Sequence, residues 1–95
     1  MPERKTIDEN AVPRLPAHVK MRFDKNRERW VVLAPERVLM PDETAVDILK
    51  RCDGKATVGT IVAALAAEYD APADVIAEDV TLLLQDLADK GLLTT

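Results

Sequence analysis

The sequence predicts an α+β fold, with a three-stranded antiparallel sheet followed by a three-helix bundle. Apolar and polar residues alternate from residue 18 to residue 24, which is the period of a half-buried strand. Beyond residue 43, apolar residues recur every three or four positions, which is the period of an amphipathic helix. Two prolines, Pro35 and Pro41, divide the intervening apolar run. The resulting order, βββααα, is typical of a compact winged-helix-like domain.

The extended half begins with a β-hairpin. Val19, Met21 and Phe23 alternate with charged or polar neighbours, and residues 25–28 form a polar turn. The second strand, residues 29–33, carries the single tryptophan of the chain. This spacing predicts two antiparallel strands joined by a short turn.

A third strand follows over residues 37–40, after a short link around Pro35, and Pro41 ends it. Because sequential strands usually pair with their neighbours, this strand is expected at the edge of the sheet. An edge strand presents unpaired backbone donors and acceptors.

The helical half carries three sets of helix signals. Expected N-terminal signals are Asp42, Thr57 and Pro72, and expected stop signals are Gly54 and Gly91. The apolar positions expected to face the core are Ala45, Ile48, Leu49 and Cys52 in the first helix, Val58, Ile61, Val62, Leu65 and Tyr69 in the second, and Ile76, Val80, Leu83, Leu84 and Leu87 in the third. Leu92 and Leu93 are expected to fold back onto the core.

Residues 1–16 contain three prolines and scattered charges without a period, which predicts a flexible N-terminal arm or linker. The folded domain is then expected over residues 17–95. Ile7, Val12 and Leu15 leave open that the arm docks onto a neighbour or onto a second copy of the chain.

Charge is distributed unevenly. Residues 1–41 hold nine Lys and Arg against six Asp and Glu, whereas residues 42–95 hold four against eleven. The extended half is therefore basic and the helical half acidic. No apolar run approaches the roughly 20 residues that span a bilayer, so no membrane association is expected and a cytoplasmic location is the default.

Catalysis is not expected of this chain. His18 is the only histidine and lies on a charged strand face, and Cys52, the only cysteine, falls on an apolar helix face. The acidic residues of the third helix have no histidine to complete a metal site, and no glycine-rich phosphate loop is present. We expect neither a metal nor a cofactor.

The second and third helices form a helix-turn-helix-like pair, which raises the alternative of a DNA-binding regulator. In that arrangement the third helix would read the duplex. Between residues 71 and 90 it carries five acids and one terminal lysine, and DNA would repel it. Only the basic hairpin, with Lys20, Arg22, Lys25, Arg27 and Arg29, favours DNA binding, so no nucleic-acid partner is expected.

An edge strand beside an amphipathic helix favours peptide binding instead. An extended peptide can add to such an edge, so that its backbone pairs with the strand and alternate side chains enter the groove. Two alternatives stay open: the third strand is simply covered by a loop or by the arm, or it serves dimerisation of the chain.

Three stretches resemble the PqqD family of pyrroloquinoline quinone (PQQ) biosynthesis. They are Arg29-Trp30-Val31-Val32-Leu33-Ala34-Pro35-Glu36-Arg37-Val38-Leu39, Asp42-Glu43-Thr44-Ala45-Val46-Asp47-Ile48-Leu49 and Cys52-Asp53-Gly54-Lys55-Ala56-Thr57-Val58. The likeness extends over roughly residues 14 to 93, including Arg14-Leu15-Pro16 and the second helix.

The resemblance implies a non-catalytic carrier that recognises the ribosomally made precursor peptide PqqA and presents it to the radical SAM enzyme PqqE. It also implies that such domains occur fused to the synthase PqqC. In this family of recognition elements the peptide pairs with the third strand and lies against the third helix. Carried onto this chain, the resemblance and the facing of the third helix point to eight residues: Arg37, Val38, Leu39, Met40, Val75, Asp79, Leu82 and Leu83. Pro41 stands where an aliphatic residue is common in relatives.

Overall fold

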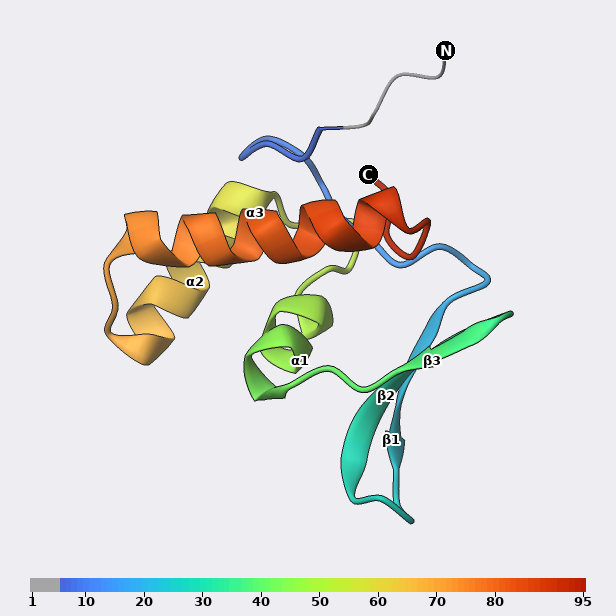
Figure 1. Cartoon of the computed structure of the whole chain (residues 1–95). Coiled ribbons are helices and arrows are strands. Elements are labelled where there is room, and N and C mark those ends of the chain that lie inside the picture. The colour runs from blue at the N-terminus through green and yellow to red at the C-terminus, as the bar shows by residue number, and fades with distance from the viewer. Residues whose placement is uncertain (1–5) are drawn as a thin grey trace.

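The fold was analysed in a computed structural model that describes residues 6–95. The elements occur in the order β1 (Lys20–Asp24), β2 (Arg29–Ala34), β3 (Arg37–Leu39), α1 (Glu43–Lys50), α2 (Val58–Tyr69) and α3 (Ala73–Asp89). The predicted βββααα order is confirmed. The hairpin of β1 and β2 projects away from the helices, while α3 runs across the opposite end of the molecule (Figure 1).

The sheet is an antiparallel meander of order β1-β2-β3, so β3 occupies an edge as predicted. Phe23 pairs with Trp30 across the first hairpin. At its tip, Asp24 Oδ1 accepts hydrogen bonds from the backbone N–H groups of Asn26 and Arg27, at 2.9 and 3.3 Å. This Asx turn reverses the chain within the predicted polar segment.

Two of the predicted N-caps are present as side-chain hydrogen bonds. Asp42 Oδ1 accepts from the N–H of Ala45 at 2.8 Å, and Thr57 Oγ1 accepts from the N–H of Thr60 at 3.2 Å. Each satisfies a backbone donor that the first turn of a helix leaves free. Pro72 precedes α3 as its capping residue, one position outside the predicted first turn.

The expectation that Gly54 ends α1 as its C′ residue is wrong. The helix ends at Lys50, and Arg51 caps it in the right-handed region. Gly54 has a φ of +79° and belongs to the following turn, where its N–H donates to the carbonyl of Pro13 at 3.1 Å. The glycine is needed there because the chain turns in the left-handed region against the N-terminal segment.

The core lies between the three helices and the inner ends of the strands. It buries the predicted positions Ile48, Leu49, Cys52, Val58, Ile61, Val62, Leu65, Val80, Leu84 and Leu87, together with Leu92 and Leu93. Tyr69, predicted to point inward, is instead 43% exposed. It lies at the last turn of α2, where its hydroxyl donates to the carboxylate of Asp47 on α1.

Residues 7–16 of the expected arm pack against the folded domain. Ile7 is 3% exposed within the core, and its N–H donates to Gln85 Oε1 of α3 at 2.9 Å. Arg14 and Thr94 exchange two backbone hydrogen bonds of 2.9 Å each, which ties the segment to the C-terminus. The segment packs as an irregular chain, so its apolar residues do not recur at the spacing of a helix or a strand. Residues 1–5 of the expected arm lie outside the described residues.

None of the helices within residues 6–95 combines the length and the apolar character of a membrane span.

Candidate functional site

The free edge of β3 is the first component of the site. Among the described strands β3 pairs only with β2, through Val32 with Leu39, Leu33 with Val38 and Ala34 with Arg37. Val38 is 53% exposed, whereas Leu39 is half-buried against the core. The backbone groups on the outer side of β3 are therefore available to another strand.

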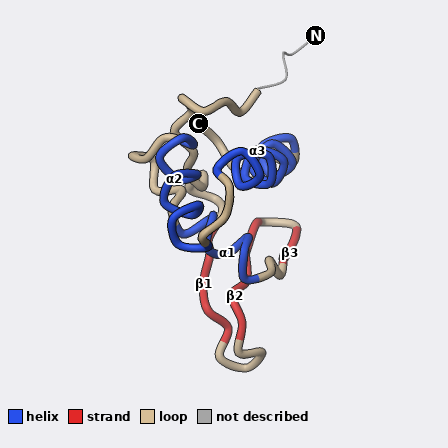
Figure 2. Tube along the Cα trace, turned by 90° about the vertical axis from the view of Figure 1, so that its left-hand side faces the viewer, coloured by secondary structure: helices blue, strands red, loops and turns tan. Residues whose placement is uncertain are grey.

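A groove lies beside this edge, where β3 runs under α3. In Figure 2, α3 and β3 lie on the same side of the molecule, with α1 next to them. The groove has a volume of about 300 Å³. It is lined by Val32, Leu39, Met40, Pro41, Asp42, Ala45, Leu49, Leu83, Asp86, Leu87 and Lys90.

The lining is mostly apolar, with charged side chains from α3 and its C-cap and from Asp42, the N-cap of α1. Leu83 and Leu87 are one turn apart on α3, and the carboxylate of Asp86 pairs with Lys90 Nζ at 2.9 Å beside them. Such a lining is suited to apolar side chains that enter from an added strand, while its charged groups can bind polar atoms of the same peptide.

The eight predicted site residues fall into two groups. Leu39, Met40 and Leu83 line the groove, and Arg37 and Val38 lie on the adjoining edge strand. Val75 and Leu82 do not line it: they are 50% and 63% exposed on α3. Asp79 is also exposed and lies one helical turn before Leu83.

Three lining residues of α3 and its C-cap were not among the predicted ones. Leu87 was expected to face the core, Asp86 counted only as one of the five acids of the third helix, and Lys90 only as its terminal lysine. Their spacing from Leu83 places all of them on one side of the helix, at i+3, i+4 and i+7. That periodicity was the signal that could have identified them.

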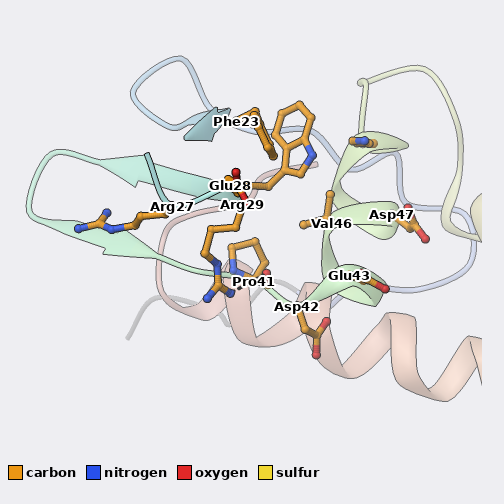
Figure 3. A pocket seen from close by; sticks show the side chains of 11 residues that line it. Phe23, Arg27, Glu28, Arg29, Pro41, Asp42, Glu43, Val46 and Asp47 are labelled. Atoms are coloured by element: carbon orange, nitrogen blue, oxygen red, sulfur yellow. Dashed lines mark hydrogen bonds between the residues drawn. The ribbon is translucent and has the colours of Figure 1, made fainter. Parts of the chain in front are cut away.

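A second hollow lies between the β1–β2 hairpin and α1, with a volume of about 720 Å³. Figure 3 shows Phe23 from the hairpin and Val46 from α1 on its two sides. The rings of Phe23 and Trp30 meet edge to face, with centroids 5.8 Å apart and planes at 67°. Lys50 Nζ lies 4.5 Å from the centroid of the Trp30 ring, at cation–π distance. The first contact lies within the hairpin, and the second joins the hairpin to α1.

The acidic side chains and the thiol of Cys52 are the groups to consider for chemistry among the described residues. No cluster of three or more His, Cys, Asp and Glu side chains capable of holding a metal occurs in residues 6–95. Burial, with a smaller contribution from Asp53, raises the pKa of Cys52 to about 12, and its thiol donates to the carbonyl of Ile48. A thiol held in this way is a poor nucleophile.

The fold and the groove define a class: small βββααα domains that present an open strand edge beside a helix. The family described as "Coenzyme PQQ synthesis protein D (PqqD)" matches residues 29–93. The chain belongs to the PqqD family.

Relatives and solved structures agree with this assignment. The chain is 55% identical, over 98% of its length and 91% of the other protein, to the "PqqA binding protein" of Rhodopseudomonas palustris strain CGA009. It is also 45% identical, over 86% of its length, to 22% of the "Bifunctional coenzyme PQQ synthesis protein C/D" of Methylorubrum extorquens.

Two solved structures resemble the chain, each at 41% identity and over 95% of its length. The first is the solution NMR structure of the PqqD truncation of Methylobacterium extorquens PqqCD, with a TM-score of 0.81 and 96% of that chain covered. It is described as a functional, stand-alone recognition element for ribosomally synthesized and post-translationally modified peptides. The crystal structure of PqqD from Xanthomonas campestris has a TM-score of 0.60 and is covered over its full length.

Proposed function

We propose that the protein is a non-catalytic carrier in PQQ biosynthesis that binds the precursor peptide PqqA as a fourth strand on the free edge of β3. The observation that carries the proposal is the juxtaposition of that edge with the apolar groove under α3. It is supported by the name of the R. palustris relative, a PqqA binding protein.

An added strand lies about 4.8 Å outside β3, with its side chains alternating between two faces. One set of alternate side chains enters the groove toward Leu83 and Leu87. The other set faces solvent beside Val38. Selectivity then resides in every second residue of the bound peptide segment.

The backbone alone does not supply micromolar affinity. Three strand residues offer about two or three hydrogen bonds, each worth about 0.5–1.5 kcal/mol net. Micromolar binding needs about 8 kcal/mol. A remainder of about 5 kcal/mol corresponds to about 200 Å² of buried apolar surface, and more once the cost of ordering the peptide is counted. The exposed portions of Val38 and Met40 and the lining leucines are the apolar surface available for this.

The predicted α3 residues that lie outside the groove would contact a different part of the peptide. Val75, Asp79 and Leu82 contact only a peptide that continues past the groove along the outer side of α3. Asp79 would there attract a basic side chain of the peptide. Asp79→Asn should then lower affinity and weaken its salt dependence, and an unchanged affinity and salt dependence would remove Asp79 from the site.

We further propose that the carrier presents the bound peptide to the radical SAM enzyme PqqE. Holding the peptide and contacting the enzyme together raises the effective concentration of the substrate. In the M. extorquens relative the C and D units form one bifunctional protein, which supports association of the carrier with other proteins of the pathway.

A second copy of the chain is an alternative occupant of the same edge. The exposed β3 edge favours it, because two edge strands can pair about a twofold axis. Sedimentation velocity separates the two occupants. Peptide addition predicts a monomer mass that rises only by the mass of the peptide, whereas edge pairing predicts a dimer that the peptide dissociates.

The proposed function is tested by titrating the ¹⁵N-labelled protein with unmodified PqqA. Shifts are expected at Arg37, Val38 and Leu39 and around Leu83, while the hairpin turn at residues 25–28 serves as an internal control. No shift at saturating peptide, or shifts confined to the hairpin turn, would overturn the proposal.

A further inference from the structure

The pairing of β2 with β3 stops before the third strand reaches α1. The last pair is Val32 with Leu39, and the same register would next place Met40 opposite Val31 and Pro41 opposite Trp30. Pro41 has no N–H and cannot donate to the ladder. The two-residue connection between β3 and the N-cap of α1 is therefore left without regular strand pairing.

A side chain from β2 occupies this position. Arg29, the first residue of β2, places its Nη2 atom 3.3 Å from the carbonyl oxygen of Met40 and 3.5 Å from that of Pro41. Figure 3 shows the Arg29 side chain extending alongside Pro41. One guanidinium nitrogen thus binds two successive carbonyls of the connection.

The neighbouring arginine of the hairpin behaves differently. Arg27 extends away from the connection in Figure 3, and its guanidinium pairs with Asp24 at 3.5 Å within the turn. Both arginines are exposed and lie two residues apart, so they contribute similar charge to this end of the sheet. Only Arg29 contacts the chain that leads out of β3.

The connection is part of the proposed peptide site. Met40, Pro41 and Asp42 all line the groove under α3, and Asp42 also caps α1, whose residues form another side of the groove. The position of the connection therefore determines where the outer edge of β3 lies relative to α3. A connection free to move would have to be ordered each time a peptide binds, which lowers affinity.

We propose that Arg29 is a positioning residue for the peptide site, which holds Met40 and Pro41 in place so that the β3 edge and the groove stay aligned. This inference rests on the proposed function. It assigns to Arg29 a role that acts through the backbone of the connection, without contact with the peptide itself.

The test uses three variants of the full chain. Arg29→Met keeps an unbranched side chain but removes its charge and its donors, and Arg29→Lys keeps the charge and a donor group. Arg27→Met is the matched control, because it removes the same charge from the same hairpin. Three quantities are measured for each: amide hydrogen exchange at the paired residues 37–39 in the free protein, PqqA affinity by calorimetry, and stability in urea.

Arg29→Met should accelerate exchange at residues 37–39 and weaken PqqA binding about fivefold, which is about 1 kcal/mol. Arg29→Lys should remain within about twofold of the unaltered protein, and Arg27→Met should change neither quantity. The denaturation midpoint should stay similar in all three, because the bonds are exposed and local.

An equal loss of affinity in Arg29→Met and Arg27→Met would show a charge effect and overturn the proposal. Unchanged exchange in Arg29→Met would overturn it as well. If the unaltered protein binds no PqqA, the proposed function is wrong. The exchange rates of the free protein do not depend on the peptide, so they still decide whether Arg29 holds the connection.

Discussion

Truncation of Met40 should weaken PqqA binding without unfolding the protein. Met40 lines the groove but follows the last paired residue of β3, and 46% of its surface is exposed. Leu82 provides a matched control, because it is an apolar residue that is 63% exposed and lies outside the groove, next to the lining residue Leu83.

The expected magnitude follows from these exposures. Burying a whole methionine side chain contributes about 1.5–3 kcal/mol, so covering the exposed half of Met40 contributes about 1 kcal/mol. Met40→Ala should therefore raise the Kd for PqqA about fivefold. Leu82→Ala should leave the Kd of a peptide confined to the groove within about twofold.

The assay is isothermal titration calorimetry with a PqqA segment just long enough to pair with β3. Both variants should keep the unfolding midpoint of the unaltered protein in urea, which ensures that affinity is compared between folded proteins. If Met40→Ala bound as tightly as the unaltered protein, or if Leu82→Ala lost as much affinity as Met40→Ala, the assignment of the groove would be refuted.

Three further predictions concern stability. Asp42→Ala should lower the free energy of unfolding by about 1 kcal/mol in urea because α1 loses its N-cap, whereas the neighbouring Glu43→Ala should change it by less than about half of that. Ile7→Ala should lower the free energy of unfolding by about 2–4 kcal/mol because Ile7 lies in the core. A change near zero would instead support a flexible N-terminal arm. The third prediction concerns pH. Burial raises the pKa of Cys52 from 9.0 to about 12, so the folded protein retains a proton that the unfolded chain releases. Stability should therefore fall as pH rises above 9, by up to about 1.4 kcal/mol per pH unit from this proton, and Cys52→Ala should remove that part of the decline.

Features that depend on near neighbours in the chain were predictable. The caps Asp42 and Thr57 bind backbone groups three residues away, so the sequence itself contains both partners. The strand and helix periods likewise report which face of one element is buried. The fold class follows from these local signals.

Features that depend on distant partners were not predictable in the same way. Ile7 hydrogen-bonds to Gln85 across 78 positions, and no local pattern marks that contact. Tyr69 continues the apolar period of α2, yet it lies at the helix end, where a polar partner on α1 was available. Gly54 has the conformation expected of a helix stop, but a contact with Pro13 accounts for its position.

The candidate site shows the same division. The edge position of β3 followed from the order of the strands. The resemblance to PqqD proteins then indicated its residues as peptide-binding ones. To predict which α3 residues face β3, one must know how the helix is rotated about its own axis. The periodicity of the sequence does not determine that rotation. Leu83 lies on the groove side, whereas Val75 and Leu82 lie outside it, because the side of α3 that faces β3 is set by packing in three dimensions.

The central claim is that the peptide pairs with the backbone of β3, and a scan of N-methylated peptides tests it most directly. Each PqqA variant carries one N-methyl group at successive backbone positions of the bound segment, and its affinity is measured by calorimetry. Because alternate N–H groups of an added strand point toward its partner, strand addition predicts losses at every second position. A uniform small effect, or no loss at any position, would contradict pairing at the β3 edge.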